Sequence, residues 1–220
     1  MYDQYDALIF DMDGVIVDSN PMHCESWVAF NRRHGLETTE AMLHRMYGKR
    51  NDQIIRDFFG EHLPEAEVLA RGRAKEELYR EMVAERLETM LVPGLREFLE
   101  RYRHLPLAVA SNAEPENVEF VLEKSGLRHY FRVVVDGHQV NRPKPFPDVY
   151  LRAAELLGVT PEECVVFEDS PSGASAAVAA KMTVIGLDTT YVILHGAVLT
   201  IHNFHSGDLE SWLQGQMRSV

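Results

Sequence analysis

The segment Asp6-Ala7-Leu8-Ile9-Phe10-Asp11-Met12-Asp13-Gly14-Val15 decides which fold we expect for this chain. Residues 7–10 form a short apolar run that ends at an aspartate, which is typical of a buried strand followed by a polar turn. Comparable apolar runs return only after residue 106, and helical patterns separate them; they lie at 107–110, 133–135, 164–167 and 183–185. Short apolar strands that alternate with helices predict an α/β fold, a Rossmann-like parallel sheet with helices on both faces.

The long interval between the first strand and the others reads as an insertion. An Asn20-Pro21 pair predicts a helix N-cap followed by proline in the first turn, and Gly35 is a natural end for that helix. Apolar residues then recur at roughly helical spacing among many charges, without a convincing strand, until Val92-Pro93-Gly94 breaks the pattern. We therefore predict a core made of residues 1–18 and 92–220, with an inserted α-helical cap at 19–91.

Polar residues stand where the predicted strands end. Ligands of parallel α/β sheets bind beyond the carboxyl ends of the strands, so these residues are the candidates for a functional site. The set contains four carboxylates, a hydroxyl, an amide and an ammonium, and its members are Asp11, Asp13, Ser111, Asn112, Lys144, Glu168 and Asp169. We expect them to converge at one edge of the sheet.

Four carboxylates at one edge require a cation. Two like charges about 4 Å apart repel by roughly 4 kcal/mol at an effective dielectric constant near 20. Oxygen ligands favour Mg²⁺ over Zn²⁺. With a divalent ion and Lys144 in place, an incoming phosphoryl group meets a metal and an ammonium, as phosphoryl transfer requires. The pattern therefore indicates a Mg²⁺-dependent phosphoryl-transfer enzyme.

Asp11 and Asp13 suit two different roles in such a reaction. A carboxylate is already ionised at pH 7, so Asp11 needs no activating base to attack phosphorus. Asp13 lies two residues further on and can exchange a proton with the leaving oxygen. To act as an acid it needs a raised pKa, and we expect its negative neighbours to raise the pKa of Asp13.

Four stretches in combination resemble the haloacid dehalogenase superfamily, in its helical-cap phosphatase and β-phosphoglucomutase-like branch. They are Phe10-Asp11-Met12-Asp13-Gly14-Val15, Ala110-Ser111-Asn112, Lys144-Pro145-Phe146-Pro147-Asp148 and Phe167-Glu168-Asp169-Ser170-Pro171-Ser172-Gly173. The resemblance covers nearly the whole chain. It implies that Asp11 forms an aspartyl-phosphate and that Asp13 is the general acid/base. It also implies phosphoryl binding by Ser111 and Lys144, with Asn112 beside them, and Mg²⁺ held by Asp11, the backbone carbonyl of Asp13 and Asp169, with Glu168 close by.

The resemblance also suggests substrate-binding residues in the cap, each with a plain alternative. His23 and Trp27 occupy positions shared with β-phosphoglucomutase-like members, although His23 could simply follow a helix N-cap. Arg50, in Tyr47-Gly48-Lys49-Arg50-Asn51-Asp52, would bind a distal phosphate, but the loop is one residue shorter than the mutase pattern and a solvated arginine is the alternative. Lys75 falls where mutases carry a sugar-contacting lysine, but an exposed helix face is the preferred interpretation of the charged run 71–77.

Two departures from the mutase pattern bear on the function and on the packing. Ser111 is followed by Asn112-Ala113-Glu114, where the mutase pattern has a small residue, a serine and a lysine, and the Ser/Asn pair resembles the phosphatases of the family. Lys181 replaces a glycine that usually follows the Ala-rich helix, which predicts a non-glycine residue with positive φ or a locally different turn.

These features favour a Mg²⁺-dependent phosphatase that hydrolyses a small phosphorylated metabolite, such as a sugar phosphate, through an aspartyl-phosphate. A β-phosphoglucomutase-type sugar-phosphate mutase is the alternative. Dehalogenation would leave Asp13, Asp169 and the metal without a purpose, and a catalytically silent scaffold would not retain both Asp11 and Asp13.

The composition of the chain limits which binding partners and which cellular location we expect. The net charge of −12 argues against nucleic-acid and anionic-membrane surfaces, and no apolar stretch reaches about 18 residues. Two cysteines without metal spacing indicate reduced thiols, and the first residues carry no secretion-type pattern. We expect a cytoplasmic monomer. His202 and His205 lack a third ligand in the sequence and are interpreted as loop histidines.

Overall fold

The computed structural model describes residues 5–46, 49–190 and 192–216, and it is built around one six-stranded parallel sheet. The spatial order of the strands is β3-β2-β1-β4-β5-β6. Their bounds are Ala7–Phe10 for β1, Leu107–Ala110 for β2, Val133–Val135 for β3, Cys164–Glu168 for β4, Thr183–Leu187 for β5 and Ala197–Ile201 for β6. The predicted α/β parallel sheet is confirmed.

Strand β1 lies in the middle of the sheet. Leu8 pairs in register with Leu107 of β2 on one side and with Val165 of β4 on the other. All four residues of β1 are buried, which explains why the run is continuously apolar rather than alternating. The neighbouring strands are parallel to β1, so the residues that follow β1, β2 and β4 lie at the same edge of the sheet.

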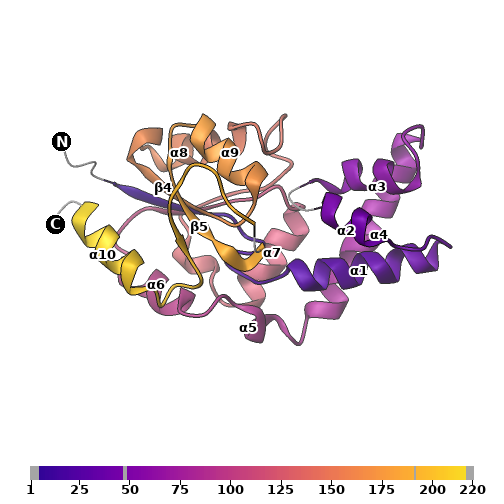
Figure 1. Cartoon of the computed structure of the whole chain (residues 1–220), viewed down its shortest axis with the longest axis horizontal. Helices are drawn as coiled ribbons and strands as arrows, with labels where there is room; N and C mark the ends of the chain where they lie inside the picture. Colours follow the sequence, from indigo (N-terminus) through magenta and orange to yellow (C-terminus); the bar gives the residue numbers. More distant parts are fainter. Residues whose placement is uncertain (1–4, 47–48, 191, 217–220) are drawn as a thin grey trace.

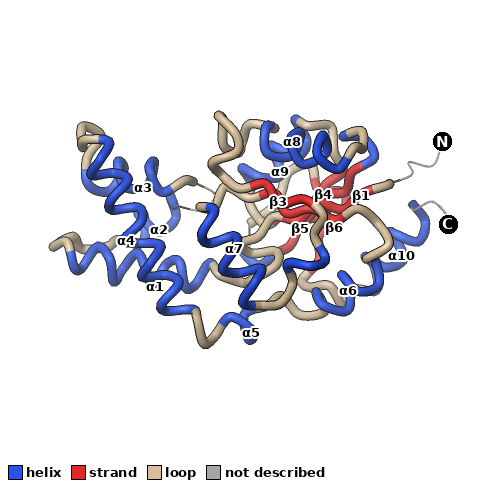
Figure 2. Tube along the Cα trace, turned by 180° about the vertical axis from the view of Figure 1, so that it is seen from behind, coloured by secondary structure: helices blue, strands red, loops and turns tan. Residues whose placement is uncertain are grey.

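Helices cover both faces of the sheet, as predicted (Figure 2). Helices α6 (Leu95–Tyr102), α7 (Pro115–Lys124) and α10 (Gly207–Gln216) pack into the apolar cluster on one face. Helices α8 (Asp148–Leu157) and α9 (Pro171–Ala179) pack into the cluster on the other face. Short 3₁₀ turns lie at Arg128–Tyr130, Pro161–Glu163 and Asp188–Thr190.

The segment between β1 and β2 forms a separate group of helices beside the sheet (Figure 1). They are α1 (Asn20–Arg33), α2 (Glu40–Met46), α3 (Asn51–Phe59) and α4 (Glu65–Val83), which we call the cap, followed by the short α5 (Leu87–Met90). The cap has an apolar cluster of its own, with Trp27, Phe30, Ile54, Ile55, Val68 and Leu78 among its buried members. We propose that the domains divide at the predicted positions, with 19–91 inserted into the core. None of the described helices is long and apolar enough to cross a membrane.

The first helix of the cap begins one residue earlier than predicted. Its N-cap is Ser19, and Asn20 is the first helical residue. Neither side chain caps the helix, because both contact the strand ends instead: Ser19 Oγ donates to Asp13 Oδ1 and Asn20 Nδ2 donates to Asp169 Oδ2. The prediction that Asn20 is the N-cap was therefore wrong, and the polar side chains at this helix start serve the site.

Lys181, after α9, adopts the positive φ that its sequence position predicted. Its φ is 63°, and it is the one described residue other than glycine with a positive φ. We expect Lys181→Gly to raise the free energy of unfolding by about 1 kcal/mol, because glycine has no Cβ to clash in the left-handed region. Urea denaturation measures the change. Lys181→Ala removes the same exposed side chain but keeps the Cβ, so it should not stabilise the protein.

Candidate active site

The centre of the site is the carboxylate that follows β1. Asp11 is 7% exposed, and its backbone N–H donates to the carbonyl of Phe167 on β4. Lys144 Nζ donates to Asp11 Oδ1 at 2.9 Å and to Glu168 Oε1 at 2.6 Å. Tyr150 on α8 donates its hydroxyl to the same Glu168 oxygen at 2.7 Å. A buried ammonium is thus held between the ends of β1 and β4.

Glu168 organises this side of the site. Besides the bonds from Lys144 and Tyr150, its Oε2 accepts from the backbone N–H groups of Asp169 and Ser170 and from the Ser170 hydroxyl. The carboxylate also fills the space beside Gly173, where a Cβ would lie 1.6 Å from Oε1. Because its oxygens already accept five hydrogen bonds, Glu168 mainly orients Lys144, and Asp11 and Asp169 have more free coordination capacity.

Asp11, Glu168 and Asp169 form a buried acidic cluster in which each offers an oxygen within 4.8 Å of the others. Burial raises the pKa of Asp11 to about 7, although Lys144 opposes the shift. Burial, with Glu168 and Asp11 nearby, also raises the pKa of Asp169 well above its ordinary value. Three buried carboxylates with one lysine carry excess negative charge, and all the donors are oxygens, so the cluster fits Mg²⁺.

The turn after β1 is shaped to bring Asp169 close. Gly14 has a φ of 78°, and a Cβ on it would lie 1.9 Å from Asp169 Oδ2. The Asp169 backbone carbonyl accepts from the Thr190 hydroxyl at 2.6 Å, and Thr189 Oγ1 donates to the Gly14 carbonyl at 2.7 Å. Glycine in the Asp-Met-Asp-Gly motif is therefore required by both backbone conformation and a close carboxylate.

Ser111 and Asn112 come to the same edge from β2, as predicted. Ser111 is buried, and its Oγ accepts from the backbone N–H of Ala113 at 3.1 Å. Asn112 Oδ1 accepts from the backbone N–H of Lys144 at 3.1 Å, which ties the loop after β2 to the lysine. Both residues line one cavity with Asp11, Asp13, Lys144 and Asp169.

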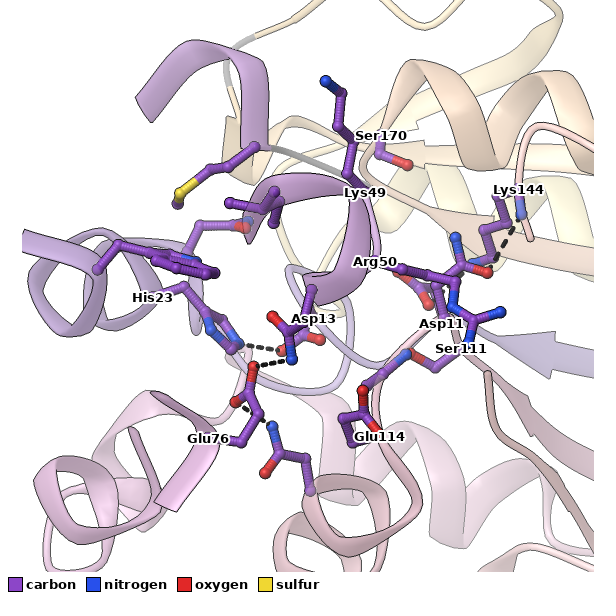
Figure 3. A pocket seen from close by; sticks show the side chains of 18 of the residues that line it. Asp11, Asp13, His23, Lys49, Arg50, Glu76, Ser111, Glu114, Lys144 and Ser170 are labelled. Carbon is purple, nitrogen blue, oxygen red and sulfur yellow. Dashed lines mark hydrogen bonds and ion pairs between the residues drawn. The ribbon is translucent and has the colours of Figure 1, made fainter. Parts of the chain in front are cut away.

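Asp13 faces the cap rather than the acidic cluster (Figure 3). Its Oδ1 accepts from Ser19 Oγ and lies 3.3 Å from His23 Nε2. Burial alone would raise the pKa of Asp13, but His23, Ser19 and Lys75 outweigh it and hold that pKa below its ordinary value. The expected rise was wrong, because the side chain turns away from its acidic neighbours.

Behind His23 lies a buried chain of charges within the cap. Lys75 Nζ is 3.1 Å from His23 Nδ1 and 2.6 Å from Glu76 Oε1. His23 stacks on Tyr79, with ring centroids 3.9 Å apart, and Lys75 lies over the Trp27 ring. Lys75 is only 1% exposed, so the prediction of an exposed helix face was wrong. The alternatives in which His23 and Lys75 belong to the cavity fit the structure.

Arg50 lies at the N-cap of α3 and lines the cavity from the cap side. Its side chain is directed towards the side where Asp11 and Ser111 lie, whereas the side chain of Lys49, which also lines the cavity, extends in another direction (Figure 3). Arg50 Nε is 3.6 Å from Asp52 Oδ1, and Lys49 Nζ pairs with Asp57 at 2.6 Å. Residues 47 and 48 of the predicted phosphate loop lie outside the described residues.

Several residues that line the cavity or contact its side chains were not identified as site residues from the sequence. They are Ser19, Asn20, Glu76, Asn117 and Tyr150, and each contacts a predicted site residue or its partner. Ser19 and Asn20 carried a signal, since two polar residues stood where a helix starts near Asp13. His202, in contrast, is an exposed histidine paired with Asp188 at 2.8 Å, which supports its interpretation as a loop residue.

Comparisons with known proteins agree with this geometry. A family model described as haloacid dehalogenase-like hydrolase matches residues 5–181. The chain is 35% identical over 186 residues to the fructose-1-phosphate phosphatase YqaB of Escherichia coli (strain K12), covering 84% of this chain and 97% of that protein. It is 32% identical over 197 residues to the phosphorylated carbohydrates phosphatase of Thermotoga maritima, covering 86% of each.

The fold is also that of a solved β-phosphoglucomutase from Clostridium difficile, with a TM-score of 0.84 and 22% identity, covering 97% of each chain. At this identity the likeness concerns the fold alone. The family model and the relatives more than 30% identical, together with the order of the strand-end residues, show that the chain belongs to the haloacid dehalogenase-like hydrolase family.

Proposed function

We propose that this hydrolase is a Mg²⁺-dependent phosphatase that cleaves a small phosphorylated metabolite, such as a sugar phosphate, through an aspartyl-phosphate on Asp11. The observation that carries the proposal is the buried Asp11 carboxylate, which Lys144 holds at 2.9 Å beside Glu168 and Asp169 on a cavity shared with the cap. The names of the two relatives, both phosphatases of phosphorylated sugars, support the substrate class.

In the first step a carboxylate oxygen of Asp11 attacks phosphorus, and the bond from phosphorus to the ester oxygen breaks. Lys144 and Ser111 bind the oxygens of the transferring group, and Asp13 gives a proton to the leaving oxygen. The substrate phosphate adds negative charge near Asp13 and thereby raises its pKa from the low value of the free protein. Mg²⁺, held by Asp11, Asp169 and the carbonyl of Asp13, would neutralise the charge that develops on the phosphoryl oxygens.

In the second step water attacks the aspartyl-phosphate. Asp13 takes a proton from that water, the bond between Asp11 and phosphorus breaks, and inorganic phosphate leaves. The low pKa of Asp13 suits this step, because the carboxylate must be ionised to accept a proton. The His23 contact at 3.3 Å keeps the Asp13 carboxylate aimed into the cavity.

The cap residues are proposed to bind the rest of the substrate. His23, Arg50 and Lys75 line the cavity opposite Asn112, so a small phosphorylated molecule between them would meet hydrogen-bonding groups on both sides. The proposal is tested by measuring phosphate release from a panel of phosphorylated metabolites with and without Mg²⁺. Release from sugar phosphates only with Mg²⁺ is the expected result, and no release from any member would contradict the proposal.

A β-phosphoglucomutase-type activity is the second candidate, favoured by the presence of Arg50 in the cavity. A mutase must hold a bisphosphate by its distal phosphate while the other phosphate reacts. Incubation with β-glucose 1-phosphate and a trace of the 1,6-bisphosphate separates the two activities. We expect free phosphate without glucose 6-phosphate. Formation of glucose 6-phosphate without free phosphate would make the enzyme a mutase.

Arg50→Met is expected to raise KM for the best sugar phosphate by about 10- to 100-fold, because a guanidinium loses its charge-assisted bonds to the substrate. Steady-state phosphate release measures the effect. Lys49→Met is the matched control, because Lys49 precedes Arg50 and also lines the cavity, but its ammonium pairs with Asp57 at 2.6 Å. Equal KM values for the parent and Arg50→Met would mean that Arg50 does not bind substrate.

The proposal also includes the cellular location and the oligomeric state of the protein. We propose a cytoplasmic monomer, as the composition predicted, with a net charge of −12 that favours neither nucleic acid nor anionic membranes.

A further inference from the structure

Glu76 on α4 is a buried carboxylate that the catalytic steps above do not use. It is 4% exposed and lines the cavity. Its Oε1 accepts from Asn51 Nδ2 of α3 at 2.7 Å and pairs with Lys75 at 2.6 Å. Its Oε2 accepts from Asn117 Nδ2 at 2.5 Å. Burial would raise the pKa of Glu76, but Lys75, His23 and the hydrogen bond from Asn117 outweigh it and lower that pKa, so the carboxylate is ionised.

Asn117 is the partner that does not belong to the cap. It lies on α7, which packs against the sheet, and it is 1% exposed. While its Nδ2 donates to Glu76, its Oδ1 accepts from Arg80 Nη1 of α4 at 2.7 Å. The amide of Asn117 is thus hydrogen-bonded at both ends, to the carboxylate of Glu76 and to the guanidinium of Arg80, which lie one turn apart on the same cap helix. The two bonds fix the amide orientation, because the carboxylate can only accept from the amide nitrogen and the guanidinium can only donate to the amide oxygen.

The same carboxylate begins a chain of contacts that ends at Asp13. Lys75 Nζ can only donate, so at 3.1 Å from His23 Nδ1 it requires that nitrogen to be the acceptor. The ring proton of His23 then lies on Nε2, the nitrogen that is 3.3 Å from Asp13 Oδ1. Glu76, by holding Lys75, sets the position and the tautomer through which His23 donates to Asp13.

We infer that Glu76, Arg80 and Asn117 form a latch between cap and core, and that Glu76 is a positioning residue that couples closing of the cap to alignment of Asp13. The inference rests on the proposed function for the role of Asp13. When α4 moves away from α7, the side chain of Asn117 separates from Glu76. Glu76 then loses one of the three side chains that contact its carboxylate. Lys75 and His23 are then less constrained, so Asp13 is fully aligned only when the cap lies against the core.

The latch can be weakened from outside the cavity. Arg80 is half-buried and is not among the residues that line the cavity, so Arg80→Met removes a latch contact without changing the substrate site. Arg71→Met is the matched control: Arg71 lies on the same helix, but it pairs with Glu67 and stacks on Phe59, both within the cap. Asn117→Ala removes the latch from the core side, at a residue that also lines the cavity.

Two readouts separate the latch from the reaction. Trp27 lines the cavity and is 1% exposed, so acrylamide quenching of its fluorescence reports opening of the cap; a Trp212→Phe background removes the other tryptophan. We expect the quenching constant to rise at least about twofold in Arg80→Met and in Asn117→Ala, with kcat/KM for the best substrate about tenfold lower. Arg71→Met should match the parent in both. Unchanged quenching in both latch variants would contradict the latch.

The positioning role has its own tests. Glu76→Gln should lower kcat more than Arg80→Met does, because it weakens the latch and also removes the charge that holds Lys75. Nitrogen NMR of the parent should show His23 protonated on Nε2. An equal loss of kcat in the two variants, or a proton on Nδ1, would refute positioning by Glu76. Quenching and NMR need no substrate, so they decide the inference even if the phosphatase assay fails.

Discussion

Asp11→Asn is expected to lower Mg²⁺-dependent phosphate release by about 10⁴-fold or more, since an amide oxygen cannot form the aspartyl-phosphate. Asparagine keeps the volume of the side chain and can still accept from Lys144 Nζ, so the site should keep its shape. The measurement is single-turnover phosphate release, with mass spectrometry of quenched enzyme to detect a phosphoryl group on the parent and none on the variant.

The same substitution should not unfold the protein, and the pKa of Asp11 explains why. The pKa is 3.8 in the unfolded chain and about 7 in the folded, metal-free protein, because burial disfavours the ionised form. The folded protein therefore retains a proton that the unfolded chain has lost, and this group's contribution to stability falls as pH rises from about 4 to about 7. Asparagine is always neutral, so Asp11→Asn removes that part of the pH dependence. Urea melts across this range without metal test the expectation.

Asp136→Asn is the matched control for Asp11→Asn. Asp136 is also a buried aspartate that directly follows a parallel strand, β3. It accepts from the His138 backbone and from Gln139, away from the acidic cluster. The Asp136→Asn variant should therefore retain the phosphate-release activity of the parent. If Asp11→Asn kept the turnover of the parent, the nucleophile would have to be a different residue.

The core of the fold and of the site was predictable because each depends on short, local patterns. A short apolar run bounded by turn residues is typical of a fully buried strand, and the topology of a parallel sheet brings the residue after each strand to one edge. Asp11, Ser111, Lys144 and Asp169 could therefore be assembled without knowing any side-chain conformation, and they line one cavity.

The periphery of the sheet was harder to predict. Strand β6 (Ala197–Ile201) lies at the edge of the sheet, and only Ile201 of its residues is buried. Its run is apolar except for Thr200, but among the described residues no α-helix separates it from β5, so the alternation of strands with helices did not indicate it. Helix α10 was not predicted either, and only Leu209 and Leu213 of its residues are buried.

In the cap, the spacing of charged residues along the sequence did not indicate which of their side chains are buried. The run 71–77 contains two arginines, a lysine and two glutamates, yet only Lys75 and Glu76 of these charged residues are buried. They are buried because α4 contacts α1, α3 and the core helix α7 together, so the helix has no simple polar face. Asp13 shows the same limit: its acidic neighbours are evident in the sequence, but the turn of its side chain towards His23 is not.

Removing divalent metal is expected to abolish activity and to destabilise the protein. Asp11, Glu168 and Asp169 are buried within 4.8 Å of one another with one lysine, so the metal-free protein bears uncompensated repulsion. Mg²⁺ at 100 times its Kd would add about 2.7 kcal/mol to the free energy of unfolding. In a chain of this size that raises Tm by roughly 5–10 °C. Thermal melts with EDTA and with Mg²⁺ measure the shift, and adding Mg²⁺ after EDTA should restore phosphate release.

Asp169→Asn identifies the source of that shift. Burial and the carboxylates beside it raise the pKa of Asp169 well above its ordinary value, which means that an ionised Asp169 is costly to the metal-free fold. A neutral amide removes this cost and also a ligand, and it can remain beside Asn20. The variant should therefore melt at or above the parent's Tm in EDTA and gain almost nothing from Mg²⁺. A variant that gained as much from Mg²⁺ as the parent would place the metal elsewhere. If neither EDTA nor Mg²⁺ changed the Tm and the activity of the parent, the acidic cluster would bind no ion. Lys144 alone would then have to compensate the negative charge of the cluster.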